Sequence, residues 1–173
     1  MASFITKESE MISQLRLKLS DLQLKDKFNT DHFLLRWIRA GKHNLILAEK
    51  IFREHMTWRE ENDMDNILSW TPPEILLTSC PIKFLGYDKD NSPVRLISMG
   101  KTSANFGVID LILQQARRFE AHFPETVKTI FIINCNAVFA AIFSLAKPLM
   151  SKATLDKLQI FSTRFQVQTI QQI

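Results

Sequence analysis

The tetrapeptide "GKTS", Gly100 to Ser103, follows a predicted strand and resembles the end of a phosphate-binding loop. In such a loop, backbone N–H groups cradle the phosphates, the lysine contacts them and the hydroxyl binds Mg²⁺. The loop also requires a glycine five positions before Gly100, where Arg95 stands. Because the whole chain has only four glycines, a phosphate- or nucleotide-binding protein built on Gly100, Lys101 and Thr102 is a minor alternative.

The acidic stretch "DKDNS", Asp88 to Ser92, resembles the start of a calcium-binding loop. Pro93 occupies the sixth position, where that loop requires glycine, so we reject a calcium site. The cysteines Cys80 and Cys135 lie far apart and lack metal-ligand spacing, which indicates reduced thiols in a cytosolic protein. We therefore expect no metal ion and no other cofactor.

An enzyme is the weakest functional interpretation of this sequence. No nucleophile, base and orienting group occur at the spacing of a catalytic motif. The net charge of +4 and the pI near 9.2 favour contact with an anionic surface. No nucleic-acid binding is expected, because basic residues neither form runs of five nor interleave with aromatic residues. The N-terminus lacks the pattern of a signal peptide, and no apolar run reaches the ~18 residues of a membrane span.

Helices are predicted for residues 1–74, which we expect to form the first domain. The stretches "HFLLRWIRAG" and "NLILAEKIFREHMTW" place apolar side chains at helical spacing. Thr30 and Asp31 are candidate N-caps for the first of these helices and Asn44 for the second, and Gly41 is suited to a helix end. His55 lies on or beside an apolar helical face, where a packed or partly solvated histidine is a simpler interpretation than a ligand.

Residues 75–173, the expected second domain, combine strands with helices. The stretch "KFLGYDKDNSPVRLISMG" predicts a β-hairpin, because two apolar runs flank turn residues. Strands are predicted near Val94–Ser98, Thr129–Asn134 and Leu158–Phe161, and "VIDLILQQARRFEAHF" is helical in pattern. This alternation indicates the α/β class, with a small and mostly parallel sheet.

One predicted helix, "NAVFAAIFSLAKPLM" from Asn136 to Met150, is apolar almost all round. Between Asn136 and Pro148 its only polar side chains are Ser144 and Lys147. A surface helix normally shows a polar face. Each large apolar side chain left in water forfeits ~1.5–3 kcal/mol. This helix must therefore cover an apolar surface, contact a bilayer or lie buried.

Two long stretches carry a resemblance to a known family. They are "HFLLRWIRAGKHNLILAEKIFREHMTWREEND" and "FPETVKTIFIINCNAVFAAIFSLAKPLMSKATLDKLQIF". Together with the hairpin, they resemble the CRAL-TRIO lipid-binding family from about Asp31 to Phe161. That family includes the yeast-type phosphatidylinositol transfer proteins and the tocopherol- and retinal-binding proteins. The resemblance implies a helical N-terminal domain followed by an α/β lipid-binding domain. The implied function is non-enzymatic binding and intermembrane transfer of a hydrophobic ligand such as a phospholipid, a phosphoinositide or tocopherol.

The resemblance also implies the site residues. In the family, the helix corresponding to Ala137–Met150 is a movable gate over the lipid cavity. The implied gate and cavity residues are Val138, Phe139, Ile142, Phe143, Leu145, Leu149, Met150, Phe131 and Ile133. In phosphoinositide-binding members, the acid of a Pro-Glu motif and a lysine in the helix after the gate contribute to the headgroup site. The matching positions here are Glu125 and Lys157.

The sequence also departs from the family pattern. Cys135-Asn136 replaces the usual Ala-Pro, and only "KTSANFG" connects the hairpin to the next helix, where family members have a further helix and a central strand. The region that normally follows the last strand is missing as well. These departures predict a shortened version of the domain, whether a truncated isoform made by splicing, a result of gene loss or an error in the gene model. A non-transferring remnant that acts through membrane or protein contact is therefore the main alternative function.

The expected partners follow from this interpretation. They are a hydrophobic lipid and, transiently, an anionic membrane surface, with no nucleic acid. We expect a monomer in the cytoplasm that is transiently membrane-associated.

Overall fold

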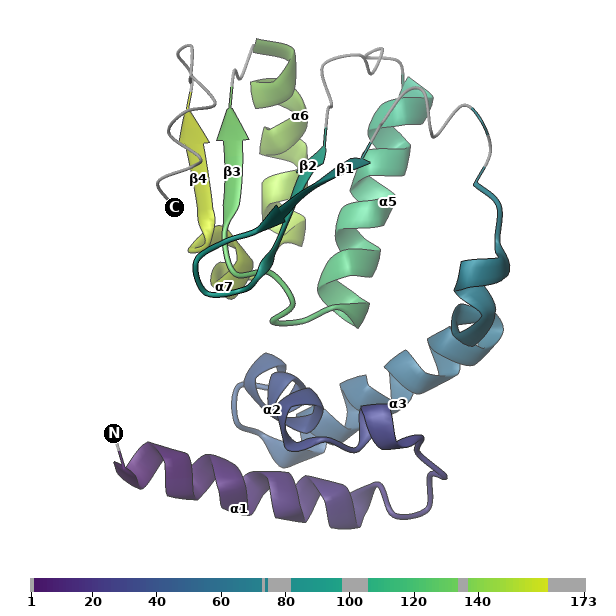
Figure 1. The fold of residues 1–173 in the computed structure, drawn as a ribbon, viewed down its shortest axis with the longest axis vertical. Coiled ribbons are helices and arrows are strands. Elements are labelled where there is room, and N and C mark those ends of the chain that lie inside the picture. Colours follow the sequence, from purple (N-terminus) through teal and green to yellow (C-terminus); the bar gives the residue numbers. More distant parts are fainter. Residues whose placement is uncertain (1, 73, 75–81, 98–105, 134–136, 162–173) are drawn as a thin grey trace.

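The fold was obtained as a computed structural model, which describes residues 2–72, 74, 82–97, 106–133 and 137–161 (Figure 1). Helices gather at the N-terminal end of the molecule, and strands with further helices form the other end. The α/β class and the N-terminal helices agree with the prediction. The "GKTS" stretch and both cysteines lie outside the described residues.

The N-terminal part consists of three α-helices and two 3₁₀ helices. In chain order these are α1 (Ala2–Lys18), η1 (Asp26–Phe28), α2 (Asp31–Ala40), α3 (Leu45–Glu61) and η2 (Met64–Ser69). Of the candidate N-caps, Thr30 and Asn44 are confirmed: Thr30 Oγ1 accepts from the N–H of Phe33, and Asn44 Oδ1 accepts from the N–H groups of Ile46 and Leu47. These bonds satisfy donors that every helix start leaves unpaired.

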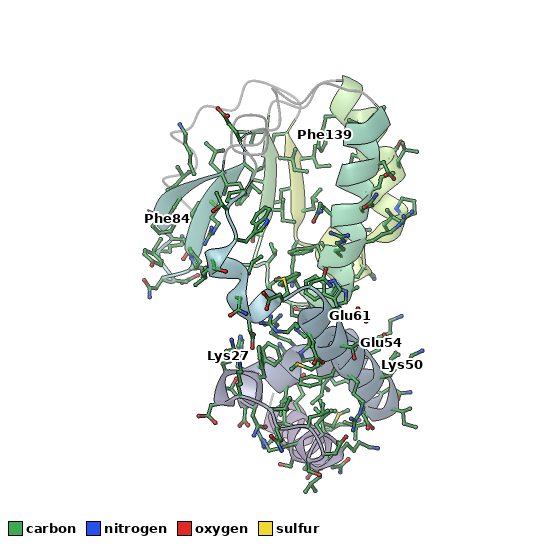
Figure 2. All side chains as sticks on the ribbon, turned by 90° about the vertical axis from the view of Figure 1, so that its right-hand side faces the viewer. Lys27, Lys50, Glu54, Glu61, Phe84 and Phe139 are labelled. Atoms are coloured by element: carbon green, nitrogen blue, oxygen red, sulfur yellow. The ribbon has the colours of Figure 1, made fainter. Side chains whose placement is uncertain are left out.

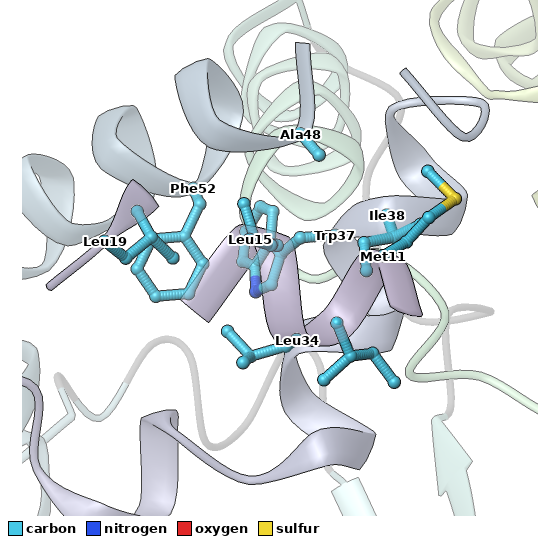
Figure 3. Packing of buried hydrophobic residues seen from close by; sticks show 9 residues of the cluster. Met11, Leu15, Leu19, Leu34, Trp37, Ile38, Ala48 and Phe52 are labelled. Atoms are coloured by element: carbon cyan, nitrogen blue, oxygen red, sulfur yellow. The ribbon is translucent and has the colours of Figure 1, made fainter. Parts of the chain in front are cut away.

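A tightly packed apolar core joins α1, α2 and α3 (Figure 3). Leu34, Trp37 and Phe52 have no exposed surface. The Trp37 and Phe52 rings meet edge to face, with centroids 5.7 Å apart, a favourable aromatic geometry. His55 is only 2% exposed, which confirms that it is packed rather than solvated.

Gly41, at the end of α2, is required for a steric reason and not for a left-handed backbone conformation. Its φ of −75° lies outside the left-handed region that favours glycine. A Cβ at this position would lie 2.8 Å from the backbone nitrogen of Ala48 in α3. Gly41 is therefore required for the close approach of two helices, while Lys42 and His43 take the positive φ angles of the turn.

The described residues of the second part include four strands. They are β1 (Ile82–Tyr87), β2 (Pro93–Ile97), β3 (Ile130–Ile133) and β4 (Leu158–Phe161). The turn between β1 and β2 makes them an antiparallel hairpin, as predicted, whereas β3 and β4 pair in parallel. The described residues thus form two separate two-stranded ladders, one antiparallel and one parallel, in place of a single mostly parallel sheet. The three strands predicted from the sequence are confirmed in position.

Helices of the second part connect these strands. They are α5 (Phe106–His122), α6 (Ala137–Ala146), η3 (Lys147–Leu149) and α7 (Lys152–Leu155). Helix α6 connects β3 to β4, so the parallel pairing is part of a β–α–β crossover. Figure 1 shows α5 and α6 beside the strands, and both α6 and η3 pack against α5.

The two parts meet where α3 contacts the end of α5. The ring of Trp58 stacks on that of His122, with centroids 4.1 Å apart and planes 10° apart. His55 lies beside the same ring, 5.7 Å from it. The Arg36 guanidinium donates to the backbone oxygen of Pro124 at 2.8 Å, which ties α2 to the loop before β3. The N-terminal helices are therefore anchored to the α/β part by both aromatic and polar contacts.

Candidate functional site

Helix α6 consists of ten residues, of which only Ser144 is polar. Its hydroxyl donates to the backbone oxygen of Ala141 at 2.7 Å, so even this group is satisfied within the helix. The helix ends where Pro148 follows Lys147, as the sequence predicts, because proline cannot continue an α-helix. The result is a short helix without a polar face.

The large side chains described on α6 are not fully buried. Phe139, Ile142 and Phe143 are partly buried, and Leu145 is 55% exposed. The only buried residue described on the helix is the small Ala146. The rings of Phe139 and Phe143, one helical turn apart, stack with centroids 5.7 Å apart. Helix α6 thus packs on α5 with one side and keeps apolar surface on another.

The other predicted cavity residues continue this partly buried apolar surface. Phe131 and Ile133 lie on β3, where Ile133 pairs with Phe161 in the parallel ladder. The Phe131 and Phe161 rings lie 6.5 Å apart. Leu149 and Met150, at the end of η3, are also partly buried. The side chain of Val138 lies outside what the structure describes.

The two predicted headgroup residues lie together although 32 positions separate them. Lys157 Nζ donates to Glu125 Oε2 at 2.9 Å, and each side chain is 26% exposed. Glu125 has a φ of +54°, in the left-handed region that non-glycine residues rarely occupy. Lys157 follows the end of α7 and directly precedes β4, so it lies just outside the helix in which the resemblance placed it. Its backbone oxygen accepts from the N–H of Ile130, which fixes the loop at the start of both parallel strands.

Arg36 completes this polar cluster from the N-terminal helices. Burial lowers the pKa of its guanidinium, an effect opposed by the nearby Glu125 carboxylate. Sequence analysis did not identify Arg36, because 88 positions separate it from its partner Pro124. We define the headgroup cluster as Arg36, Glu125 and Lys157. It has two cations and one anion, and the carboxylate can accept hydrogen bonds while the cations can attract an anionic group.

The described residues show neither a cluster of metal ligands nor a membrane-spanning helix. They contain no group of three or more side chains placed to hold a metal ion. Among the same residues, no helix has both the length and the apolar character needed to cross a bilayer.

Comparisons with known proteins support the resemblance seen in the sequence. Residues 89–173 match the family model of the CRAL/TRIO domain. Protein ctg-1 of Caenorhabditis elegans is 31% identical over 93 residues, which cover 54% of this chain and 23% of that protein. The chain therefore spans less than a quarter of the length of this relative. The matched region includes β2, α5, β3, α6 and β4, on which the candidate cavity residues lie.

Proposed function

We propose that the protein is a CRAL-TRIO lipid-binding protein that holds a hydrophobic ligand in its α/β part, with α6 as a movable gate. The proposal rests mainly on α6, an all-apolar helix whose described large side chains are only partly buried. The family match over residues 89–173 supports the same function. Transfer of the ligand between membranes follows if the gate opens at a bilayer.

The energetics of α6 favour a bound lipid over an empty site. Burial of apolar surface contributes about 25 cal/mol per Å². Phe139, Ile142, Phe143 and Leu145 all retain exposed surface, so a ligand that covers them adds several kcal/mol, of the order of a domain's whole stability. A hydrocarbon chain supplies that cover without requiring polar partners, which α6 cannot offer.

We propose further that the headgroup cluster selects a lipid with an anionic, hydroxyl-bearing headgroup, as a phosphoinositide has. Lys157 and Arg36 would attract the phosphate, and Glu125 would accept from a hydroxyl. The ion pair between Lys157 and Glu125 holds both groups in place before the ligand arrives, which lowers the entropic cost of binding. A protein of this kind would act as a monomer at cytoplasmic membrane surfaces and would need neither a cofactor nor a catalytic residue.

Lipid retention tests the proposal. The recombinant protein should carry lipid that mass spectrometry detects in an organic extract. Phe139→Asp and Phe143→Asp should abolish retention, because a carboxylate buried without a partner is strongly unfavourable. Leu17→Asp is the matched control, since Leu17 lies on α1 and is 74% exposed.

The proposal fails if the wild-type protein is folded by circular dichroism, yields no lipid and takes none from vesicles. That result would favour the alternative of a non-transferring remnant that acts through membrane or protein contact. Retention of lipid by Glu125→Gln and Lys157→Met with an unchanged headgroup composition would contradict only the role of the headgroup cluster.

A further inference from the structure

The β1–β2 hairpin presents an apolar face that α6 and the headgroup cluster do not use. Cross-strand partners in an antiparallel pair share a face, and the pairs here are Ile82 with Ile97, Phe84 with Arg95, and Tyr87 with Pro93. We define the outer face of the hairpin by these six residues. A register shift between Phe84 and Gly86 keeps Tyr87 on the same side as Phe84.

The outer face is exposed. Its four large apolar side chains are more than half exposed, at 58% for Ile82, 55% for Phe84, 65% for Tyr87 and 52% for Ile97. Val94 and Leu96 alternate with these residues along β2 and are partly buried, so β2 has a distinct inner side, whereas Leu85, at the register shift in β1, is 51% exposed. Figure 2 places Phe84 on the side of the molecule away from α5. A contiguous exposed apolar face of this kind marks an interaction site.

Hydrogen bonds make the hairpin tip a defined structure. Asp88 Oδ1 accepts from the backbone N–H groups of Asp90 and Ser92, at 2.9 Å and 2.8 Å. Lys128, which precedes β3, donates to Asp88 at 2.7 Å and to Asp90 at 2.6 Å. The pKa of Asp88 is lowered, chiefly by its hydrogen bond from Lys128. The hairpin is thus tethered to the α/β part, and both of its acids share one neutralising cation.

This arrangement leaves the hairpin positively charged. Residues 82–97 contain Lys83, Lys89 and Arg95 but only two acids, and Lys128 adds a further positive charge at the tip. No ion pair within the described part of the chain involves these three cations of the hairpin. Arg95 lies on the outer face itself, opposite Phe84.

We propose that the outer face of the hairpin docks on an anionic lipid bilayer. Phe and Tyr side chains suit the boundary between headgroups and acyl chains, and each nearby Lys or Arg is attracted to anionic headgroups. A hairpin lying flat at this depth keeps its backbone groups within reach of water, so no hydrogen bond is lost. The inference rests on the proposed function in one respect, because a lipid carrier has to meet membranes. It assigns part of that contact to a surface separate from α6.

The charge of the outer face favours a bilayer over a second copy of this chain as its binding partner. In a two-fold symmetric dimer the same face would meet itself, which would bring two Arg95 side chains together. Like charges across an interface are unfavourable, whereas an anionic bilayer compensates all of them.

Vesicle co-sedimentation of the full chain tests the proposal, with phosphatidylcholine vesicles prepared with and without added phosphatidylserine. The wild type should bind the anionic vesicles more strongly. Phe84→Ser/Tyr87→Ser and Lys89→Glu/Arg95→Glu should each lower binding at least tenfold, since each double variant removes two favourable contacts with the bilayer. The matched controls are Ile46→Ser, at a position 75% exposed on α3, and Lys50→Glu on the same helix, and neither should change binding. Figure 2 places Lys50 in the N-terminal helices, well apart from Phe84.

Lipid content, measured in organic extracts of the same variants, separates this inference from the proposed function. The hairpin variants should retain lipid as the wild type does, because the outer face lies outside the candidate cavity. If the hairpin variants sediment like the wild type while Ile142→Ser/Phe143→Ser does not, docking occurs through α6 and the inference is overturned. It is also overturned if light scattering shows a dimer that Phe84→Ser/Tyr87→Ser converts to a monomer. An absence of lipid from every extract would contradict the proposed function and leave the vesicle comparison intact.

Discussion

The N-terminal helices and the α/β part differ in how completely they bury their apolar side chains. Of the buried residues within the described chain, all but Ala146 lie in the N-terminal part. Trp37 and Phe52 have no exposed surface there, whereas Phe131, Phe139 and Phe143 in the α/β part are only partly buried. The α/β part thus contains the most apolar helix, α6, but the less complete core.

The described N-terminal helices enclose a core of fully buried side chains, whereas the described strands and α6 of the α/β part keep their large apolar side chains partly exposed. A protein interior normally packs as densely as an organic crystal. Apolar strands and an apolar helix whose side chains remain partly exposed would suit the proposed lipid site. The contrast between a closed core and an open one is therefore our main structural argument for function.

The largest expected effect on stability comes from creating a cavity in the core of the N-terminal helices. Phe52→Ala should lower the free energy of unfolding by about 4 kcal/mol, because it leaves a cavity among fully buried rings. Phe143→Ala in lipid-free protein should cost about 2 kcal/mol or less, since its neighbours are incompletely packed. Urea denaturation measures both changes. Tryptophan fluorescence reports the N-terminal part, because Trp37, Trp58 and Trp70 all lie there. Equal losses in the two variants would show that the two cores do not differ.

Acid should weaken the junction between the two parts. Burial lowers the pKa of His55 to about 3, with smaller contributions from Arg59, His122 and Arg36. Burial also lowers the pKa of His122. In the unfolded chain His55 takes up a proton near pH 6.5, whereas in the folded protein it stays neutral until the pH falls toward 3. The free energy of unfolding is therefore highest above pH 6.5 and decreases as the pH falls from 6.5 toward 3.

Between pH 7 and pH 5, His55 alone should reduce the free energy of unfolding by about 2 kcal/mol. Urea denaturation at these two pH values measures the loss. His55→Phe should remove most of this dependence, because a phenyl ring carries no proton and Nδ1 of His55 has no hydrogen-bond partner to lose. An undiminished pH dependence in this variant would assign the effect to other groups.

A smaller effect is expected at the polar contact between the two parts. Arg36→Met removes the hydrogen bond to the backbone oxygen of Pro124 but keeps an apolar side chain of similar length. The expected loss is about 1–2 kcal/mol, as for a partly buried hydrogen bond from a charged donor. The variant should also separate the unfolding transitions seen by fluorescence and by circular dichroism. Lys50→Met is the matched control, since Lys50 makes only an exposed pair with Glu54 at 3.9 Å, and it should change little.

Local patterns were sufficient to predict most elements of the fold. The β-branched run at 130–133, the turn residues between β1 and β2, and the caps Thr30 and Asn44 all act through near neighbours in the chain. The structure also brings Glu125 and Lys157 together, as their shared role in the resemblance implied.

Contacts between distant positions could not be predicted in the same way. The stack of Trp58 on His122 and the bond from Arg36 to Pro124 depend on how the two parts dock, which no local pattern contains. The need for glycine at 41 arises from the approach of Ala48, which also becomes visible only in three dimensions. The incomplete burial of α6 belongs to this class, because an apolar sequence fits a core helix equally well.

Hydrogen exchange with and without lipid tests the central claim most directly. Protein purified with its lipid and protein stripped by organic extraction and refolded are compared peptide by peptide by mass spectrometry. If a lipid completes the open core, its removal should accelerate exchange in α5, β3, α6 and β4 and leave α1, α2 and α3 unchanged, because local openings follow local packing. Equal exchange in the α/β part of both samples, with lipid shown to be present in one, would contradict the account.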